Sequence, residues 1–467
     1  MLSPSVVGEL KRIFGENDVL TSPIKLEAYA YDSSPFFAQP EAVVLADSTE
    51  EVSLLMELAS RHNIVVIARG AGTNLSGGCI PIHGGIVVAL SRMNRILDID
   101  PVNETAWVEP GVTNMALQEA VAIHGYMFAP DPASLKVATI GGNVAECAGG
   151  MRGVKFGVTR DHLLGMEVVL CDGQVVMLGE GGKYFPGFDV TGLFCGSEGT
   201  FGIITKIKVK LTPLSEAVRT MMAVFDSLDK AGDTVSAIIA KGIIPTTLEI
   251  MDQVLVRAVD DYLQLGLPRQ AEAILLIEVD GFAVEVDRQT ETIVAICKEM
   301  GATQVNKANS EEERKNLWLA RRSGNGALGR IKAAYMVQDV TVPRYKLPKM
   351  LRLVADIAKK YEIVIAQMAH AGDGNLHPHL LYDPYDQAEK HRVEEAAKEI
   401  FHAALEEGGT LTGEHGIGIE KIDYMPFAFS QDDLEFMLEV KRALDPQMLL
   451  NRGKVLRYAM EESDGHP

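Results

Sequence analysis

The first part of the chain shows a helical pattern of apolar residues followed by two strand patterns. Apolar residues at helical spacing follow a capping-box pattern, S-x-x-E, at 48–51, which predicts a helix over 49–62. The apolar run at 64–68 predicts a short buried strand, and it leads directly into the loop RGAGTNLSGG at 69–78. A second strand pattern follows at 84–90. Since no helical pattern lies between the two strands, the glycine-rich loop is expected to connect them.

The later segments predict a hairpin and then a repeated strand-helix-strand order. The residues at 166–178 predict a hairpin with an Asp-Gly turn, and the alternating strand at 205–211 is expected to close the first domain before Pro213. Between about 217 and 310 the order strand, helix, strand occurs twice, which is typical of a ferredoxin-like antiparallel sheet. A helix, a hairpin and a long helix over about 385–407 are expected to follow.

Glycine is concentrated in three clusters of the first domain. They are RGAGTNLSGG, the segment 130–157, which has little periodicity and is predicted to be a long loop, and CGSEGTFGI at 195–203. The first cluster lacks the helix that a Rossmann dinucleotide site requires, and the chain has no GK[ST] of a P-loop. Backbone N–H groups of such a loop can instead approach an anion closely.

Composition and charge exclude several classes of protein. The 467 residues are too many for one core, so two or three domains are expected, and the net charge of -20 argues against broad contact with nucleic acid. No run of about 18 apolar residues and no signal-peptide pattern is seen, which predicts a soluble cytoplasmic protein without a transmembrane segment. The five cysteines form no C-x-x-C pair, so a cluster held by thiolates is not expected and buried free thiols are.

The stretch HAGDGNLHPH concentrates residue types that bind metals. His370 and His377 flank a predicted turn, so a hairpin can bring their imidazoles together, and Glu414 in GEHG is the best candidate for a third ligand. Such a set suits a divalent transition metal, and iron(II), zinc and manganese all fit it. Asp373 is expected to shape the turn. His379 is left open between lining the site and a structural role.

Taken together, the three glycine clusters, HAGDGNLH, GEHGIG and the NRGK tail resemble a known flavoprotein family. The clusters are similar to the flavin domain of the vanillyl-alcohol oxidase and p-cresol methylhydroxylase (PCMH) superfamily, and the full set resembles its FAD-dependent D-2-hydroxy-acid dehydrogenase branch, which includes D-lactate dehydrogenase and the glycolate oxidase flavoprotein subunit. The resemblance spans about 36–456. Arg452 departs from it, because the family usually has proline in its N-P-G-K ending.

This resemblance implies an α+β fold with a PCMH-type, two-subdomain FAD-binding domain and a ferredoxin-like cap. The expected domains are a helical lead-in at 1–35, the FAD-binding domain at 36–214, a cap or substrate domain with the metal site at 215–420, and a C-terminal segment at 421–467 that packs on the FAD domain.

The resemblance also implies which residues hold FAD. The cofactor is expected to be noncovalent, since the first loop has no histidine or cysteine where covalent relatives attach it. The residues implied are Arg69, Gly70, Ala71, Gly72, Thr73, Asn74, Ser76, Gly77, Pro130, Thr139, Gly141, Gly142, Asn143, Gly157, Thr159, Glu198, Gly199, Gly202, Ile203, Ile204 and Asn451.

Two further residues receive catalytic roles. His415, next to Glu414, is the candidate base for the substrate hydroxyl, and Arg321 is by resemblance the clamp for the substrate carboxylate. Hydroxyglutarate-type relatives have a lysine near the segment that here contains Met336 and Gln338, so D-lactate is favoured, with glycolate as the alternative.

The sequence leaves open the electron acceptor and, with it, two alternative classes of protein. Electrons are expected to pass to an external acceptor, an electron-transfer flavoprotein, an iron-sulfur subunit or a quinone, with a protein partner favoured. A flavin-free metallohydrolase and a non-catalytic electron-relay subunit are the readings from other classes. Flavin absorbance and its bleaching by substrate separate them.

Overall fold

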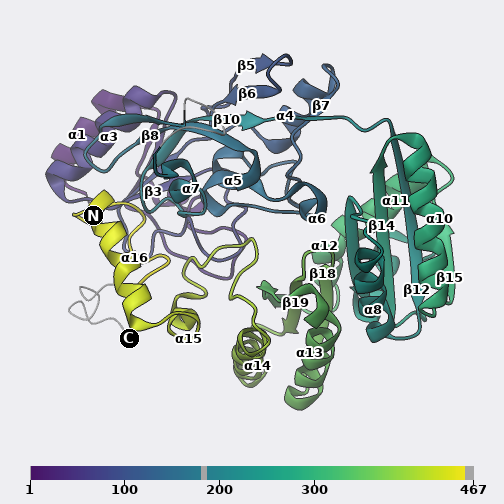
Figure 1. Ribbon diagram of the computed structural model, residues 1–467. Helices are drawn as coiled ribbons and strands as arrows, with labels where there is room; N and C mark the ends of the chain where they lie inside the picture. Colours follow the sequence, from purple (N-terminus) through teal and green to yellow (C-terminus); the bar gives the residue numbers. More distant parts are fainter. Residues whose placement is uncertain (1, 180–186, 458–467) are drawn as a thin grey trace. The chain divides into compact units, whose positions relative to one another are not determined.

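The computed structural model describes residues 2–179 and 187–457 (Figure 1). The contacts between residues divide the chain into two units. Unit 1 comprises Met1–Gly149, Val158–Leu214 and Glu414–Pro467, and unit 2 comprises Gly150–Gly157 and Ser215–Gly413. The chain thus returns to unit 1 at Glu414, seven residues before the expected boundary at 421. The short segment at 150–157, expected in the FAD domain, belongs to unit 2, where Lys155 pairs with Asp280.

The first sheet of unit 1 has the strand order β1-β2-β4-β3. Its strands are β1 (Val19–Leu20), β2 (Ala42–Leu45), β3 (Val66–Arg69) and β4 (Ile86–Ala89). β3 and β4 pair in parallel, with Val66 opposite Ile86, so the chain must cross over between them. The glycine-rich loop makes this crossover, and no helix occurs within the described segment 70–85, as the sequence predicted.

Both faces of this sheet are buried, which explains its continuous apolar strands. Alternate residues such as Val44, Val66 and Val88 pack against helices α1 (Pro4–Phe14) and α3 (Thr49–His62), while Val43 and Val87 belong to a second cluster. Ser48 caps α3 by accepting from the Glu51 N–H, so the predicted helix start is confirmed.

The second sheet of unit 1 is antiparallel, with the order β5-β6-β10-β8-β9. Its strands are β5 (Ile96–Asp100), β6 (Thr105–Val108), β8 (Leu163–Val169), β9 (Val175–Leu178) and β10 (Ile203–Lys210). Helices α4 (Asn114–Ala122), α5 (Ile140–Glu146) and α7 (Val190–Phe194) supply residues to its core. Shorter elements of the unit are α2 (Pro23–Glu27), β7 (Tyr126–Met127), η1 (Thr159–His162) and β11 (Thr212–Pro213).

One prediction for this region was wrong. The segment 130–157, expected to be a long loop, contains α5 and, in unit 2, the short helix α6 (Gly153–Phe156). Thr139 caps α5 by accepting from the Gly142 N–H, and Ile140 and Val144 enter the core. With two consecutive glycines, helix propensity alone does not reveal α5, and tertiary packing stabilises it.

The C-terminal residues of unit 1 pack on its first sheet. Helix α16 (Gln431–Leu444), preceded by η3 (Ile422–Tyr424) and α15 (Met425–Ala428), leads into a segment that runs parallel to β3. The Val66 N–H donates to Leu449 O at 2.8 Å, and the Asn451 N–H donates to Val66 O at 2.9 Å. The tail therefore lies next to the strand that leads into the glycine loop.

Unit 2 is built on an antiparallel sheet of order β15-β12-β14-β13-β18-β19-β16, with β17 also paired to β19. The strands are β12 (Ala217–Phe225), β13 (Thr247–Asp252), β14 (Ala273–Gly281), β15 (Gln304–Lys307), β16 (Ala334–Val337), β17 (Val340–Thr341), β18 (Val364–His370) and β19 (Asn375–Tyr382). The two predicted strand-helix-strand repeats supply four of these strands.

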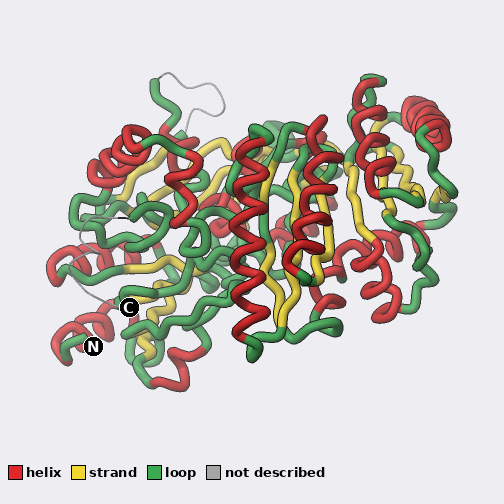
Figure 2. Tube along the Cα trace, turned by 90° about the horizontal axis from the view of Figure 1, so that it is seen from below, coloured by secondary structure: helices red, strands yellow, loops and turns green. Residues whose placement is uncertain are grey.

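Helices cover the strands of unit 2 in two groups. One group, α8 (Leu228–Ala240), α10 (Ala283–Glu299), α13 (Leu347–Tyr361) and α14 (Gln387–Glu406), packs side by side along the sheet, and Figure 2 shows red helices lying over its yellow strands. The other group, α9 (Gln253–Leu263), α11 (Glu311–Arg322) and α12 (Gly324–Leu328), packs on a different set of strand residues, which includes Met222, Ile274 and Met368. The helices of unit 2 therefore pack against two different sets of strand residues.

No helix in the described part of the chain is both long enough and apolar enough to cross a membrane.

Candidate functional site

The first glycine cluster is a shaped loop. Gly72 and Gly77 have φ angles of 70° and 79°, in the left-handed region that glycine adopts without strain. Asn74 Oδ1 accepts from the backbone N–H groups of Ser76 at 2.8 Å and Gly78 at 2.7 Å, so this side chain fixes the turn. A side chain at Gly70 would collide with Thr139 Oγ1. The loop thus approaches the second cluster at a point where only glycine fits.

The second and third glycine clusters lie side by side. The Gly196 N–H donates to Val144 O at 2.9 Å, and the Glu198 N–H donates to Ala145 O at 2.8 Å. Asn451 joins them to the first cluster, because its Nδ2 donates to Gly78 O at 2.8 Å and to Glu198 O at 2.7 Å. Three segments that are distant in the sequence therefore form one glycine-rich surface in unit 1, which fits the close backbone approach that a dinucleotide pyrophosphate requires.

Most residues assigned to FAD by resemblance lie in this unit. Gly157 is the exception, since it belongs to unit 2. Arg69 is the last residue of β3 and is buried; its Nη1 donates to Cys79 Sγ at 3.2 Å, and its guanidinium lies 5.7 Å from the ring centroid of Tyr29. Thr159 donates through Oγ1 to Ala148 O at 2.6 Å. Through these contacts the Arg69 and Thr159 side chains stabilise unit 1 itself.

The loop that contains His415 is anchored by residues of the glycine clusters. Asn74 Nδ2 donates to His415 O at 3.4 Å, and Ser76 Oγ donates to Gly416 O at 3.1 Å. Both carboxylate oxygens of Glu198 accept backbone N–H groups, from Ile417 and from the following glycine, at 2.7 Å. Residues assigned to FAD thus also position the candidate base.

Two carboxyl groups, those of buried Glu198 and half-buried Glu146, lie next to this loop together with a buried lysine. Burial raises the pKa of Glu198, although the N–H donors act against this, and burial and the neighbouring Glu198 raise the pKa of Glu146 well above its usual range. Lys421, fully buried, donates to Gly416 O at 3.0 Å and to Ser76 Oγ at 3.3 Å. No sequence pattern indicated a role for Lys421, because a single lysine after GIGIE is usually on the surface.

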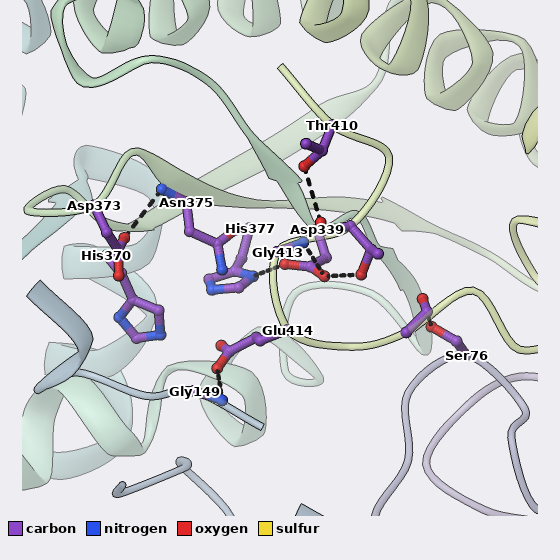
Figure 3. Close-up of polar contacts among 12 residues, drawn as sticks. Ser76, Gly149, Asp339, His370, Asp373, Asn375, His377, Thr410, Gly413 and Glu414 are labelled. Atoms are coloured by element: carbon purple, nitrogen blue, oxygen red, sulfur yellow. Dashed lines mark hydrogen bonds and ion pairs between the residues drawn. The ribbon is translucent and has the colours of Figure 1, made fainter. Parts of the chain in front are cut away.

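The histidines of HAGDGNLHPH lie on a hairpin of unit 2, as predicted. His370 ends β18 and His377 lies on β19, with their ring centroids 5.0 Å apart (Figure 3). Asp373 Oδ1 accepts from the Asn375 N–H at 3.2 Å and so shapes the turn. His379 Nε2 lies 2.9 Å from Asn325 Oδ1 and its Nδ1 lies 2.7 Å from His377 O, which gives this side chain a structural role.

A buried glutamate that the sequence analysis did not single out connects His370 with Arg321. His370 Nδ1 lies 2.7 Å from Glu249 Oε1. Arg321 donates from Nε and Nη2 to Glu249 Oε2, at 2.7 and 2.6 Å. Glu249 is fully buried and lies opposite His370 in the β13–β18 ladder. The available signal was Glu249, the one charged residue in the interior of the apolar strand TLEIMD, whose last residue is Asp252.

Asp339 is a second carboxylate missed in the sequence. Its Oδ1 lies 3.6 Å from His377 Nδ1, and its Oδ2 accepts from Thr412 Oγ1 at 2.6 Å and from the Gly413 N–H at 2.9 Å (Figure 3). Gly413 is the last residue of unit 2, and Glu414 follows it directly in the chain. Asp339 therefore fixes the backbone position from which the chain leaves the histidine cluster for Glu414.

Glu414 itself belongs to unit 1 by its contacts. Its Oε2 accepts from the Gly149 N–H at 3.1 Å, within the part of the second glycine cluster that belongs to unit 1 (Figure 3). Unit 2 thus contains the two histidines, Arg321 and two buried carboxylates, while unit 1 contains Glu414 and His415.

Two family models match this chain. One is described as FAD binding domain and matches residues 40–179, and the other is described as FAD linked oxidases, C-terminal domain, and matches residues 214–455.

Named relatives match over almost the whole chain. The glycolate oxidase subunit GlcD of Bacillus subtilis (strain 168) is 44% identical over 457 residues, with 97% of both chains covered. GlcD of Escherichia coli (strain K12) is 42% identical, covering 94% of this chain and 88% of its own length. A D-lactate dehydrogenase of Anaerostipes hadrus is 33% identical, covering 97% and 98%.

Solved structures support the same fold. p-Cresol methylhydroxylase with substrate bound has a TM-score of 0.81 at 19% identity, covering 96% of both chains. Alkyldihydroxyacetonephosphate synthase has a TM-score of 0.78 at 21% identity, covering 97% of this chain and 86% of its own. At these identities the likeness concerns the fold.

Proposed function

We propose a specific reaction for this chain, which belongs to the FAD-linked oxidase family and is an FAD-dependent hydroxy-acid oxidoreductase. The reaction is the oxidation of a small 2-hydroxy monocarboxylate to the 2-oxo acid. Glycolate is the preferred substrate, and D-lactate is the second candidate. The sequence alone favoured D-lactate. Glycolate moves ahead because the relatives named as glycolate oxidase subunits are 44% and 42% identical, against 33% for the one named as a D-lactate dehydrogenase.

The arrangement around Glu249 is the observation that carries this proposal. Glu249 neutralises Arg321 and orients its guanidinium with two hydrogen bonds, so the planar cation is held rigidly on α11. The guanidinium has five N–H donors, and those on Nη1 point along directions that Glu249 does not occupy. We assign these donors to the substrate carboxylate.

The histidine cluster has the chemistry of a metal site. His370 Nδ1 lies against Glu249, and we assign its Nε2 to the metal, as in carboxylate–histidine–metal arrangements. His370 and His377, with Glu414 one residue beyond the Asp339 anchor, would hold a divalent metal. Such an ion would make the substrate hydroxyl more acidic.

His415 receives the proton in this scheme. A neutral imidazole on the anchored GEHGIG loop can accept the hydroxyl proton as the Cα–H bond is broken. FAD, when bound to the glycine clusters of unit 1, supplies the two-electron acceptor.

The substrate is tested by anaerobic mixing of the FAD-loaded protein with a panel of acids. We expect rapid bleaching of the flavin with glycolate, slower bleaching with D-lactate, and little with L-lactate or D-2-hydroxyglutarate, since no cation replaces the lysine of hydroxyglutarate-type relatives at Met336–Gln338. Stopped-flow absorbance measures the rates. A flavin that stays oxidised with every small 2-hydroxy acid would contradict the proposed reaction.

The same reduced enzyme tests the acceptor. The relatives GlcD are named subunits, which supports an external protein acceptor. We propose an iron-sulfur subunit or an electron-transfer flavoprotein, and we expect reoxidation by the purified partner protein to exceed reoxidation by a soluble quinone analogue at equal concentration.

The proposed metal role predicts that one variant loses its metal but keeps its FAD. We expect His370→Ala to lose bound metal by about tenfold or more while its flavin absorbance is retained. Plasma mass spectrometry and the flavin spectrum measure the two contents.

His379→Asn is the matched control, because it changes another buried histidine of the same hairpin whose nitrogens contact Asn325 and the backbone. It should keep its metal. Equal metal content in His370→Ala and wild type would exclude His370 as a ligand without affecting the FAD-dependent reaction.

A further inference from the structure

Two cysteines that are distant in the sequence meet within unit 1. Cys147 ends α5 in the second glycine cluster, and Cys195 opens the third. The Gly196 N–H donates to Val144 O at 2.9 Å and the Glu198 N–H donates to Ala145 O at 2.8 Å, which fixes the two segments side by side. A methyl group placed on Gly196 would lie 3.4 Å from Cys147 Cβ. The backbone therefore holds the segments of the two cysteines next to each other, and both side chains pack in the same hydrophobic core.

The two thiols differ in environment, as an attacking and a resolving thiol must. Cys147 is half-buried, and the hydrogen bond from Cys195 lowers the pKa of its thiol to about 7, helped by the backbone N–H and the charge of Arg160. Cys195 is 2% exposed, and its contact with Cys147 and burial raise the pKa of its thiol. Thiolates are the reactive form, so Cys147 is the attacking group.

The other three thiols have the opposite character. Burial raises the pKa of Cys79 and Cys297 to about 12 and that of Cys171 to about 11. This contrast places thiol reactivity at a single point of the chain, between the second and third glycine clusters.

We propose that Cys147 and Cys195 are a reversible disulfide site oxidised by hydrogen peroxide. The Cys147 thiolate attacks one peroxide oxygen, the O–O bond breaks, and hydroxide leaves, which produces a sulfenic acid on Cys147. The Cys195 thiol then attacks this sulfur, an S–S bond forms, and water leaves. Two thiols are oxidised as one peroxide is reduced to two water molecules. A dithiol reductant reverses the change by thiol–disulfide exchange.

The disulfide would connect the end of α5 to the residues just before Glu198. Since Glu198 anchors the His415 loop through Ile417, oxidation would restrict the segments that position the flavin and the candidate base. The inference does not depend on which hydroxy acid is the substrate.

The site is tested by titrating the FAD-loaded protein, with all of its thiols reduced, with hydrogen peroxide. We expect the thiols counted after denaturation to fall from five to three, a tryptic peptide pair linking Cys147 to Cys195 to appear without reduction, and dithiothreitol to restore five. Cys147→Ser should keep its four thiols at the same dose. Cys195→Ser should fall from four thiols to three, with a sulfenic acid on Cys147 and no linked peptide pair.

Cys297→Ser is the matched control, because it removes a buried thiol in unit 2 and should still lose two thiols, from four to two. Five thiols remaining at a dose that oxidises free cysteine would overturn the proposal. So would sulfinic acid on Cys147 with Cys195 still reduced, or the loss of two thiols from the Cys147→Ser variant.

Discussion

Replacement of Glu249 by glutamine is expected to lower kcat/KM for the hydroxy acid by about 100-fold or more. The change removes the charge partner of Arg321 and the acceptor of His370 in one step, and both groups are buried. Removal of one partner of a buried ion pair costs about 3–5 kcal/mol, and here the cost falls on the groups assigned to the substrate carboxylate and the metal. Steady-state kinetics with an artificial acceptor and the metal content of the purified variant measure the effect.

Glu278→Gln is the matched control for this variant. Glu278 is a buried carboxylate on the neighbouring strand β14, and it accepts from Trp318 Nε1 at 2.8 Å and from Arg314, which lies on the same helix as Arg321. Both variants should unfold at lower temperature than wild type. Only Glu249→Gln should have a lower metal content and a lower kcat/KM than wild type. Equal kinetics in the two variants would show that Glu249 only stabilises the fold.

Secondary structure was predictable where the apolar residues follow a single period and a clear signal marks the end of the element. α3 begins at its capping box, and α14 begins and ends within a few residues of the expected bounds. α5 was missed because two adjacent glycines conceal a helix that a Thr139 cap and apolar packing stabilise. The parallel pairing of β3 with β4 was not visible either, since pairing direction depends on contacts between strands and not on their own residues.

The candidate site was predictable to the extent that its residues occur in compact motifs. The hairpin and the close approach of the His370 and His377 rings follow from HAGDGNLH, where a turn signal separates two ligand-type residues. Glu249 lies on β13 and Asp339 lies between β16 and β17. Both are distant in the sequence from the histidines, and the order of strands in the sheet brings them there. A glutamate inside an apolar strand is the one local sign that a buried charge has a partner.

The protein contacts of the FAD-assigned residues add a constraint that no motif expresses. Asn74, Ser76 and Glu198 contact the GEHGIG loop, so a substitution there changes both the glycine surface and the position of His415. A loss of activity in such a variant therefore does not by itself identify a flavin contact. The flavin spectrum and the pH dependence of flavin reduction separate the two effects.

Replacement of His415 by asparagine is expected to slow flavin reduction by about 10²- to 10⁴-fold, the usual contribution of a positioned general base. Asn74, Ser76 and Glu198 hold the loop through backbone atoms of residues 415–418, so the variant should keep its fold and its FAD. The decrease should appear in the limiting rate of reduction and not in the substrate concentration at half-maximal rate, because proton removal belongs to the chemical step.

The pH profile distinguishes a base from a residue that only positions the loop. In the wild type, the rate of reduction should fall at acid pH as the imidazole becomes protonated, and this acid limb should be absent from His415→Asn. His391→Asn, which changes an exposed histidine on α14, should keep both the rate and the acid limb. A His415→Asn variant that is slow but retains the wild-type acid limb would assign the base to another residue and leave His415 a positioning role.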